Sequence, residues 1–143
     1  MPWYYQNEPF TPEMIGDHVG FVYRITDLEN GMKYIGKKLF FTTQKLKPLK
    51  GKKRKRTVVK QSDWQEYFSS SDTIKTLVEE RGADSFHREI LVLCKTRGEL
   101  SYMEAKLQFD NDVLLRGDYY NGIIQCRINH THVKNLWFDE KSS

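Results

Sequence analysis

The sequence has few cysteines and no long apolar run, which argues against a cysteine-based metal site and against a membrane-spanning protein. Its two cysteines, Cys94 and Cys126, are far apart and in no metal-ligand spacing, so we expect reduced packing thiols. No apolar run approaches the roughly 20 residues that a membrane span needs. The opening residues MPWYYQNEPF lack the charged and apolar regions of a signal peptide. We therefore expect a cytoplasmic protein without a membrane partner.

Acidic residues are missing from one long stretch of the chain. Between Glu29 and Asp63 there are twelve Lys and Arg residues and no Asp or Glu. That leaves 11 basic and 19 acidic residues elsewhere, a net charge of −8, within a chain whose net charge is +4. Clustering of this kind indicates a localised contact with a polyanion.

Most of these cations fall in residues 45–60, KLKPLKGKKRKRTVVK, which we call the basic insertion. It is low in complexity, broken by Pro48 and Gly51, and too charged to enter a core. We predict an exposed arm that contacts phosphates and positions a nucleic acid without reading its bases, the alternative being a disordered loop. Its nine cations are Lys45, Lys47, Lys50, Lys52, Lys53, Arg54, Lys55, Arg56 and Lys60.

The length of 143 residues and the hydrophobic content of 38% predict a single domain with a real core. We place that core at about residues 20–121, interrupted by the basic insertion and followed by a C-terminal extension at 122–143. The lead-in 1–19 contains three prolines and should form no regular element. The elements we predict are strands at about 20–29 and 32–38, a short helix at 63–68, a helix at 72–82, a central strand at 86–94 and a helix at about 99–112.

The first two strands should pair as a hairpin across Asn30-Gly31, a strong two-residue turn signal. With those two residues as the loop, paired residue numbers sum to 61 and Tyr23 lies opposite Lys38. The three strands then give an α+β fold, a small three-stranded antiparallel sheet flanked by helices.

One face of this hairpin has an unusual composition. Because side chains alternate, Tyr23 shares a face with Tyr34, Gly36 and Lys38. Buried phenols need hydrogen-bond partners, and glycine inside a strand often marks the close approach of a ligand or another backbone. The face therefore suggests chemistry, although half-exposed packing is the plainer interpretation, and a three-residue loop would turn the second strand over.

A carboxylate on the last predicted helix also stands out. Leu100, Met103 and Leu107 define the buried stripe of this helix, and Glu104 lies immediately beside it, where a purely structural helix usually has an apolar residue. We expect its side chain to point inward.

With these residues the chain resembles the GIY-YIG nuclease superfamily. Phe21-Val22-Tyr23 stands in place of the first triplet and Tyr34-Ile35-Gly36 matches the second. SYMEAKLQF, with Glu104, is similar to the helix that bears the family's metal carboxylate, and Asn121 falls where the family's terminal Asn is expected. The resemblance covers about residues 20–121 and is nearest to the phage-encoded, homing-type (Seg-like) endonucleases.

The resemblance implies a Mg²⁺-dependent (or Mn²⁺-dependent) endonuclease that hydrolyses DNA phosphodiester bonds, without a small-molecule cofactor, in the host-cell cytoplasm if phage-encoded. Glu104 would be the metal ligand, and Asn121 would complete the catalytic set. Tyr23 would deprotonate the attacking water or relay its proton, its pKa lowered by Lys38 and Lys33, and Tyr34 would orient water or phosphate.

Two departures from the family pattern leave alternatives open. The family Arg about ten residues after the second triplet is absent, so Lys38, Arg54 or Arg56 would bind the phosphate. A serine run replaces a family His. Two other functions are therefore considered, a nucleic-acid-binding protein that has lost catalysis and a repair nuclease for branched DNA. Beyond the nine cations above, the expected DNA contacts are Lys33, Lys37, Ser70 and Ser71.

Three histidines carry no predicted function. His87 lies in a strand and should be a packing or surface residue. His130 and His132 lack a carboxylate or thiol in register and are expected to be tail residues rather than a metal site.

Overall fold

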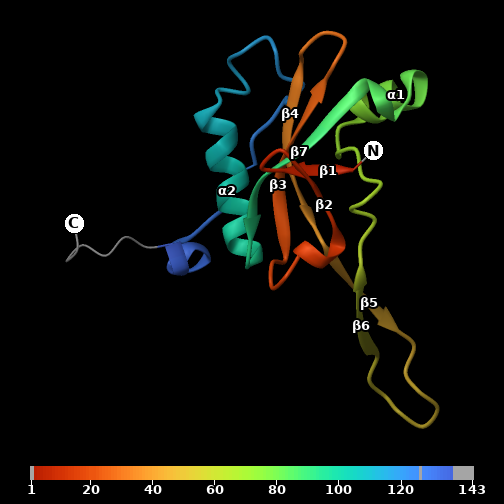
Figure 1. Cartoon of the computed structure of the whole chain (residues 1–143). Coiled ribbons are helices and arrows are strands. Elements are labelled where there is room, and N and C mark those ends of the chain that lie inside the picture. Colours follow the sequence, from red (N-terminus) through yellow and green to blue (C-terminus); the bar gives the residue numbers. More distant parts are fainter. Residues whose placement is uncertain (1, 126, 137–143) are drawn as a thin grey trace.

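The computed structural model describes residues 2–125 and 127–136 and has a five-stranded mixed sheet at its centre. The strand order is β2-β1-β7-β3-β4, with α2 on one face and α1 on the other (Figure 1). The strands are β1 (Trp3–Tyr5), β2 (Glu8–Phe10), β3 (Gly20–Asp27), β4 (Lys33–Leu39), β5 (Phe41–Leu46), β6 (Arg56–Gln61) and β7 (Phe86–Cys94). The helices are α1 (Asp72–Arg81) and α2 (Arg97–Asp110), with 3-10 helices at Pro12–Met14, Ala83–Ser85 and His130–Leu136.

The α+β class and the three predicted strands are confirmed, but the predicted size of the sheet is wrong. The lead-in adds the hairpin β1–β2 to the open side of β7, and β1 runs parallel to β7 with Tyr4 opposite Glu89. Trp3 drives this docking because its indole is 1% exposed in the core. Pro9 is tolerated because β2 is an edge strand, where one side needs no ladder donor.

The predicted pairing of β3 with β4 is shifted by two residues. Tyr23 lies opposite Gly36, and Lys38 lies opposite Phe21. The cause is a longer turn, closed by the hydrogen bond from the Gly31 N–H to the Asp27 carbonyl. Since a two-residue shift preserves the alternation of faces, Tyr23, Tyr34, Gly36 and Lys38 still share one face.

The Asp27 side chain explains why the turn is longer than the Asn-Gly signal suggested. Its carboxylate accepts the Glu29 N–H at 3.0 Å, the Arg81 guanidinium at 2.6 Å and the Tyr120 hydroxyl at 2.8 Å. Burial opposes ionisation of Asp27, but the hydrogen bonds from Arg81, Tyr120 and Glu29 outweigh it and lower the pKa of the carboxyl. The turn is thereby tied to α1 and to the chain after α2.

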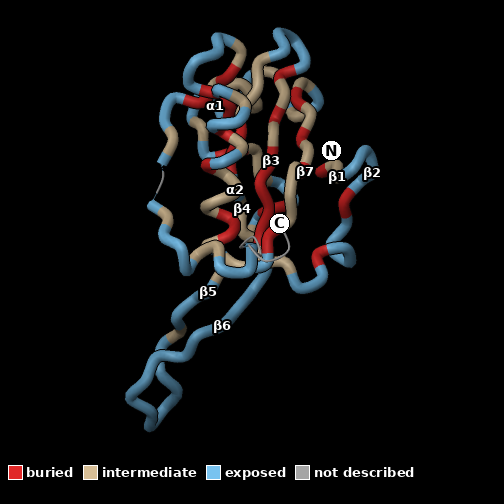
Figure 2. Tube along the Cα trace, turned by 90° about the vertical axis from the view of Figure 1, so that its left-hand side faces the viewer, coloured by how far each residue is buried: buried red, intermediate tan, exposed pale blue. Residues whose placement is uncertain are grey.

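Two hydrophobic cores flank the sheet. The larger is aromatic and includes Trp3, Phe21, Tyr23, Phe40 and Trp64, whose rings meet edge-on or tilted. The smaller packs α2 against β3 and β4 through its predicted stripe, in which Leu100 is buried and the neighbours Met103 and Leu107 are partly buried. Figure 2 shows β3 between them, buried along most of its length.

The segment 63–68 forms turns, so the helix predicted there is absent. Its carbonyls are used by distant side chains: Trp3 Nε1 donates to the Trp64 carbonyl at 2.6 Å, and Arg88 Nη1 donates to those of Gln65 and Tyr67 at 2.9 Å. Tertiary contacts have replaced the local hydrogen bonds that a helix requires.

The basic insertion belongs to a two-stranded antiparallel ribbon, formed by β5 and β6 from Phe41 opposite Gln61 to Leu46 opposite Arg56. It projects from the sheet, and β6 is exposed along its whole length (Figures 1 and 2). The prediction of an exposed arm is confirmed, and the disordered alternative is replaced by regular strands.

The two helices agree with their predictions to within two residues. Ser71 caps α1, and Thr96 caps α2 by accepting the Glu99 N–H at 3.1 Å. None of the helices in the described ranges is long and apolar enough to cross a membrane. Cys94 is buried with its pKa raised to about 11, as a packing thiol requires, while Cys126 lies outside the described residues.

Candidate active site

Tyr23 is the centre of the candidate site. The residue is 0% exposed, and its ring packs against Trp3, Tyr34 and Tyr67 at centroid distances of 5.3, 6.2 and 5.9 Å. The ring also lies directly over Gly36: a Cβ at that position would be 2.5 Å from the Tyr23 hydroxyl oxygen. Glycine is therefore required here, because any side chain would displace the phenol.

The Tyr23 hydroxyl is buried and makes no hydrogen bond of good geometry within the part of the chain that the structure describes. The Tyr67 phenol interacts with it, but a buried hydroxyl without a well-aligned partner is costly and indicates a group held for a ligand or for chemistry. Burial raises the pKa of Tyr23 well above 10, and the nearby phenols of Tyr67 and Tyr34 and the carboxylate of Glu104 raise it further. The predicted lowering by Lys38 and Lys33 is therefore wrong.

Glu104 reaches the same place from α2. This carboxylate is half-buried, and burial raises its pKa, partly offset by the charge and the backbone N–H of Lys37. Lys37 belongs to β4, the edge strand, so Glu104 lies along the free edge of the sheet. Because Gly36 has no side chain, the Tyr23 hydroxyl extends across β4 toward this edge, which explains why the two groups influence each other.

The same edge is held in place by two amides. Asn121 accepts the Ile35 N–H at 3.0 Å and donates to the Ile35 carbonyl at 2.8 Å, as a neighbouring strand would. Gln108, one turn after Glu104 on α2, donates to the same carbonyl at 2.9 Å. The oxygen and the nitrogen of the Asn121 amide are thus both committed to backbone, so Asn121 positions β4 rather than facing the phenols.

Lys38 is on the predicted face but is already paired. Its ammonium lies 2.6 Å from the Asp63 carboxylate, whose pKa it lowers, and 4.1 Å from the centre of the Tyr67 ring. Sequence reasoning missed Tyr67 and Asp63 because the segment 63–68 was expected to form a helix. The sequence signal for Tyr67 was an aromatic residue among polar ones, which does not by itself indicate a functional residue.

The remaining predicted contacts divide between the two faces of β4. Tyr34 hydrogen-bonds Ser70 at 3.1 Å on the Tyr23 face, while the Ser71 hydroxyl is used to cap α1. Lys33 lies on the other face, where its ammonium donates to the Gly31 carbonyl at 3.1 Å. Ser70 is therefore beside the candidate site, and Lys33 and Ser71 are not.

A groove leads from the edge of β4 toward the ribbon. It is lined by Lys37, Lys38 and Thr42 on the strand side and by Arg97 and Ser101 on α2. Lys37 Nζ donates to Ser101 Oγ at 2.9 Å. Arg97 also lines the groove and is a further candidate for the phosphate-binding cation, one that the sequence did not suggest. Arg54 and Arg56 do not reach the groove, since Arg56 is at the far end of the ribbon, about 17 Å beyond its base at about 3.3 Å per residue.

The side chains present fit Mg²⁺ held by a single protein carboxylate. Among the described residues no group of three His, Cys, Asp or Glu side chains is arranged to hold a metal. Mg²⁺ needs no such group, because waters and substrate phosphates usually complete its ligands around one or two carboxylates. Glu104, whose charge acts on the Tyr23 phenol, is the carboxylate we assign to this role.

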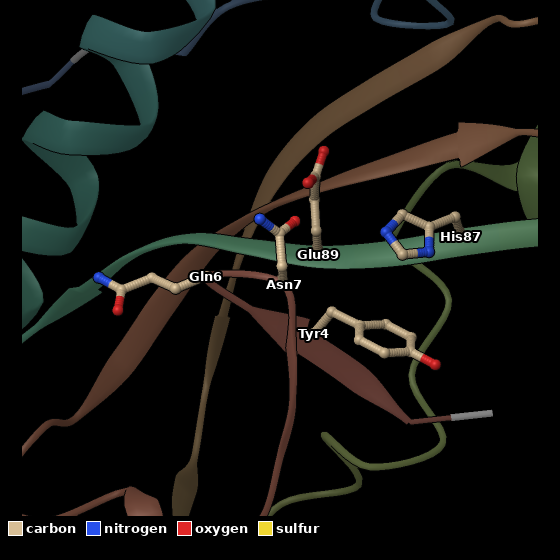
Figure 3. Close-up of a pocket in the computed structure, with 5 residues that line it drawn as sticks. All are labelled: Tyr4, Gln6, Asn7, His87 and Glu89. Carbon is tan, nitrogen blue, oxygen red and sulfur yellow. The ribbon is translucent and has the colours of Figure 1, made fainter.

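A second hollow lies between β1 and β7 and is lined by Tyr4, Gln6, Asn7, His87 and Glu89 (Figure 3). The His87 ring stacks on Tyr4 at 5.0 Å, and Glu89 is neutralised by Arg24 at 2.6 Å. His87 is therefore a packing residue, as expected, and this hollow contains no unpaired carboxylate.

Comparison with known families supplies the assignment that geometry alone leaves open. Residues 3–124 match the family described as "Putative endonuclease segE, GIY-YIG domain". The chain belongs to this family. The match begins within β1, so the N-terminal hairpin that was not recognised from sequence is part of the GIY-YIG domain. No curated protein and no solved structure was found to match the chain.

Membership of the family makes this GIY-YIG domain a nuclease domain with DNA as its substrate. The two phenols of the triplets and the glycine of the second triplet lie together on one face of β4, and Glu104 lies beside Lys37 of the same edge strand. The residues that hold this edge are Asn121 and Gln108, which lie beyond the triplets in the chain.

Proposed function

We propose that this GIY-YIG domain is a Mg²⁺-dependent DNA endonuclease whose active site is the edge of β4 between Tyr23 and Glu104. The observation that carries the proposal is the fully buried hydroxyl of Tyr23, which makes no hydrogen bond of good geometry among the described residues and which Gly36 allows to extend over β4, where the half-buried carboxylate of Glu104 raises its pKa. Cleavage of a phosphodiester needs an activated water and compensation for the charge that develops on phosphate.

Glu104 is the residue that would hold the metal. When bound, Mg²⁺ (or Mn²⁺) supplies positive charge to the phosphate oxygens and lowers the pKa of a coordinated water. The raised pKa of Glu104 reflects burial, so the carboxylate gains from a cationic partner. With one protein carboxylate, we expect weak binding of Mg²⁺ by the free protein and tighter binding when DNA phosphates are present.

Tyr23 would hold the proton of the attacking water or relay it. Its raised pKa keeps it a phenol at neutral pH, so its hydroxyl is able to donate a hydrogen bond as well as accept one. Part of that rise comes from the negative charge of Glu104, and neutralising this charge removes that part. Tyr34, fixed by Ser70, would orient the water or a phosphate oxygen on the same face.

The test is a plasmid-cleavage assay in Mg²⁺ with Glu104→Gln. The substitution removes the anionic ligand with little change in volume, so cleavage should fall below detection while the thermal midpoint and the affinity for DNA change little. Glu99→Gln is the matched control, since Glu99 is on the same helix and its carboxylate accepts the backbone N–H of Lys95 at 3.2 Å.

The results separate the competing functions. Equal cleavage by Glu104→Gln and the wild type would remove Glu104 from the chemistry. Binding without any metal-dependent cleavage by the wild type would favour the catalytically weakened binding protein. The homing-type role, a hypothesis from the resemblance, requires one long preferred site, whereas faster cutting of branched than of linear substrates would favour a repair nuclease.

A further inference from the structure

The ribbon β5–β6 carries features that phosphate binding alone does not explain. Val58 and Val59 are 40% and 63% exposed on β6, and Gln44 is exposed opposite Val58. Lys and Arg suffice for phosphates, whereas an exposed amide beside an apolar side chain matches the chemistry of base edges.

The register sorts the ribbon into two faces. Directly paired residues share a face, so Gln44 and Val58 lie with Thr42, while Thr43 and Val59 lie on the opposite face. The cations Lys60 and Arg56 flank the Gln44 face at its two ends. They are paired there with Thr42 and Leu46.

The base of the ribbon shows which of its two faces lies on the same side as the groove beside the candidate active site. Thr42 lines the groove with Lys37, Arg97 and Ser101, whereas Phe41, on the other face, packs against the aromatic core. The base is anchored by Ser62, whose N–H donates to the Phe40 carbonyl at 2.8 Å and whose hydroxyl donates to the Leu39 carbonyl at 2.6 Å. A duplex along the groove therefore meets the Gln44 face.

We propose that the Gln44 face of the ribbon enters the major groove of duplex DNA and reads an A·T base pair near the cleaved bond; this inference rests on the proposed function. The major groove, about 12 Å wide, admits a two-stranded ribbon, which the minor groove, about 6 Å wide, does not. Charge complementarity favours the same partner, since the 45–60 segment contains nine cations and no acidic residue.

The side chains define the base pair. Gln44 has an amide that pairs with N6 and N7 of adenine, and Val58, directly opposite, has methyl groups suited to the thymine methyl. The six cations of the tip between the strands would hold the flanking phosphates; they are Lys47, Lys50, Lys52, Lys53, Arg54 and Lys55.

The distance from the active site sets where the base pair lies. Lys37 is beside Glu104, and Gln44 follows it by seven residues. At about 3.3 Å per residue, Lys37 and Gln44 are at most about 23 Å apart, which corresponds to about seven base pairs of about 3.4 Å each. The preferred A·T pair should lie within that distance of the cut.

The experiment selects bound duplexes from a random-sequence pool with the full chain carrying Glu104→Gln, so that binding is measured without cleavage. We expect one position at which A·T is enriched, and adding Gln44→Ala should reduce that enrichment about tenfold or more, the value of one bidentate contact. Val58→Ala should weaken the same position by a smaller factor. Single-stranded DNA should compete poorly.

Matched controls come from the opposite face. Thr43→Ala and Val59→Ala alter neighbouring residues of the same strands, so they should leave the enrichment unchanged. Equal effects on both faces, an absence of any base preference, failure to bind duplex DNA, or equal competition by single strands would each overturn the inference. A wild type that cuts plasmid without base preference would overturn this inference and leave the proposed nuclease function standing. Enrichment of A·T without metal-dependent cleavage by the wild type would overturn the nuclease function and leave this inference standing.

Discussion

Strands β4 and β5 are separated by a single residue, Phe40, and yet they are opposite in character. The Tyr23 face of β4 is closed by aromatic rings, so each side chain is fixed by its neighbours. Half of β5 and all of β6 are exposed, and the two strands are held by their mutual ladder and by the anchored base. Chemistry at a phosphate needs the precision of the first arrangement, whereas contact with a long polyanion needs the reach of the second.

The largest effect should come from removing one oxygen at the centre of the packed face. Tyr23→Phe keeps the ring contacts and deletes a hydroxyl that has no partner of good geometry, so folding should be unchanged or slightly stabilised. Cleavage should fall by about 10²-fold to 10⁴-fold, the usual value of a proton-transfer group. Single-turnover rates and thermal melts measure both. A loss below threefold would make the phenol structural.

The pH dependence gives this prediction a sign. Because the pKa of Tyr23 lies well above 10, its ionised fraction rises about tenfold per pH unit throughout pH 7 to 9. If Tyr23 accepts the proton, the wild-type rate should increase across that range, and Tyr23→Phe should flatten the increase. A wild-type rate that is constant with pH would contradict proton transfer by this phenol.

Next in size is the ribbon, where affinity rather than rate should change. If about five of its cations touch phosphates, log affinity should fall with log salt at a slope of about −4 to −5. Replacing Lys52, Lys53, Arg54, Lys55 and Arg56 by Gln should flatten that slope by several units. Cleavage at saturating DNA should survive, since these residues are outside the groove. An unchanged slope would make the ribbon a bystander.

These two regions also differ in how well the sequence predicted them. The alternation of side chains correctly predicted that Tyr23, Tyr34, Gly36 and Lys38 share one face. The predicted register was wrong by two residues, and an even shift leaves every side chain on the same face. The register itself depended on Asp27 binding Arg81 and Tyr120, partners 54 and 93 residues away, which no local pattern encodes.

The missed elements have the same origin. β1 is three residues long and owes its place to a parallel pairing with β7, some 85 residues later. In the ribbon, charge and low complexity predicted an exposed arm without strands, although Thr57, Val58 and Val59 have high strand propensity. The family triplets and Glu104 were recognisable, whereas Tyr67, Asp63 and Arg97 join the site only through tertiary structure.

A third test alters the packed face without touching a polar group. Gly36→Ala places a methyl group 2.5 Å from the Tyr23 oxygen and 2.9 Å from the Tyr34 ring. The Tyr23 ring has little room to move beside Trp3, so the phenol must shift, and a displacement of about 1 Å can cost about 10²-fold in rate. Gly122→Ala, with nothing within 4 Å, is the control that should cleave normally.

The smallest effect is expected where the two regions meet, at the ion pair between Lys38 and Asp63. Asp63 is 71% exposed, so the pair adds little to stability, and Asp63→Asn should barely change the melting temperature. It would, however, release the Lys38 ammonium, whose side chain is only 18% exposed and already faces Tyr67. If Lys38 binds the scissile phosphate, as the absent family Arg requires of some cation, DNA affinity should rise a few-fold at low salt, and Lys38→Gln should abolish that gain. Titrations with the two single variants and the double variant measure the coupling. An Asp63→Asn affinity equal to that of the wild type would leave the other cations of the groove, Lys37 on β4 and Arg97 on α2, as the phosphate-binding groups.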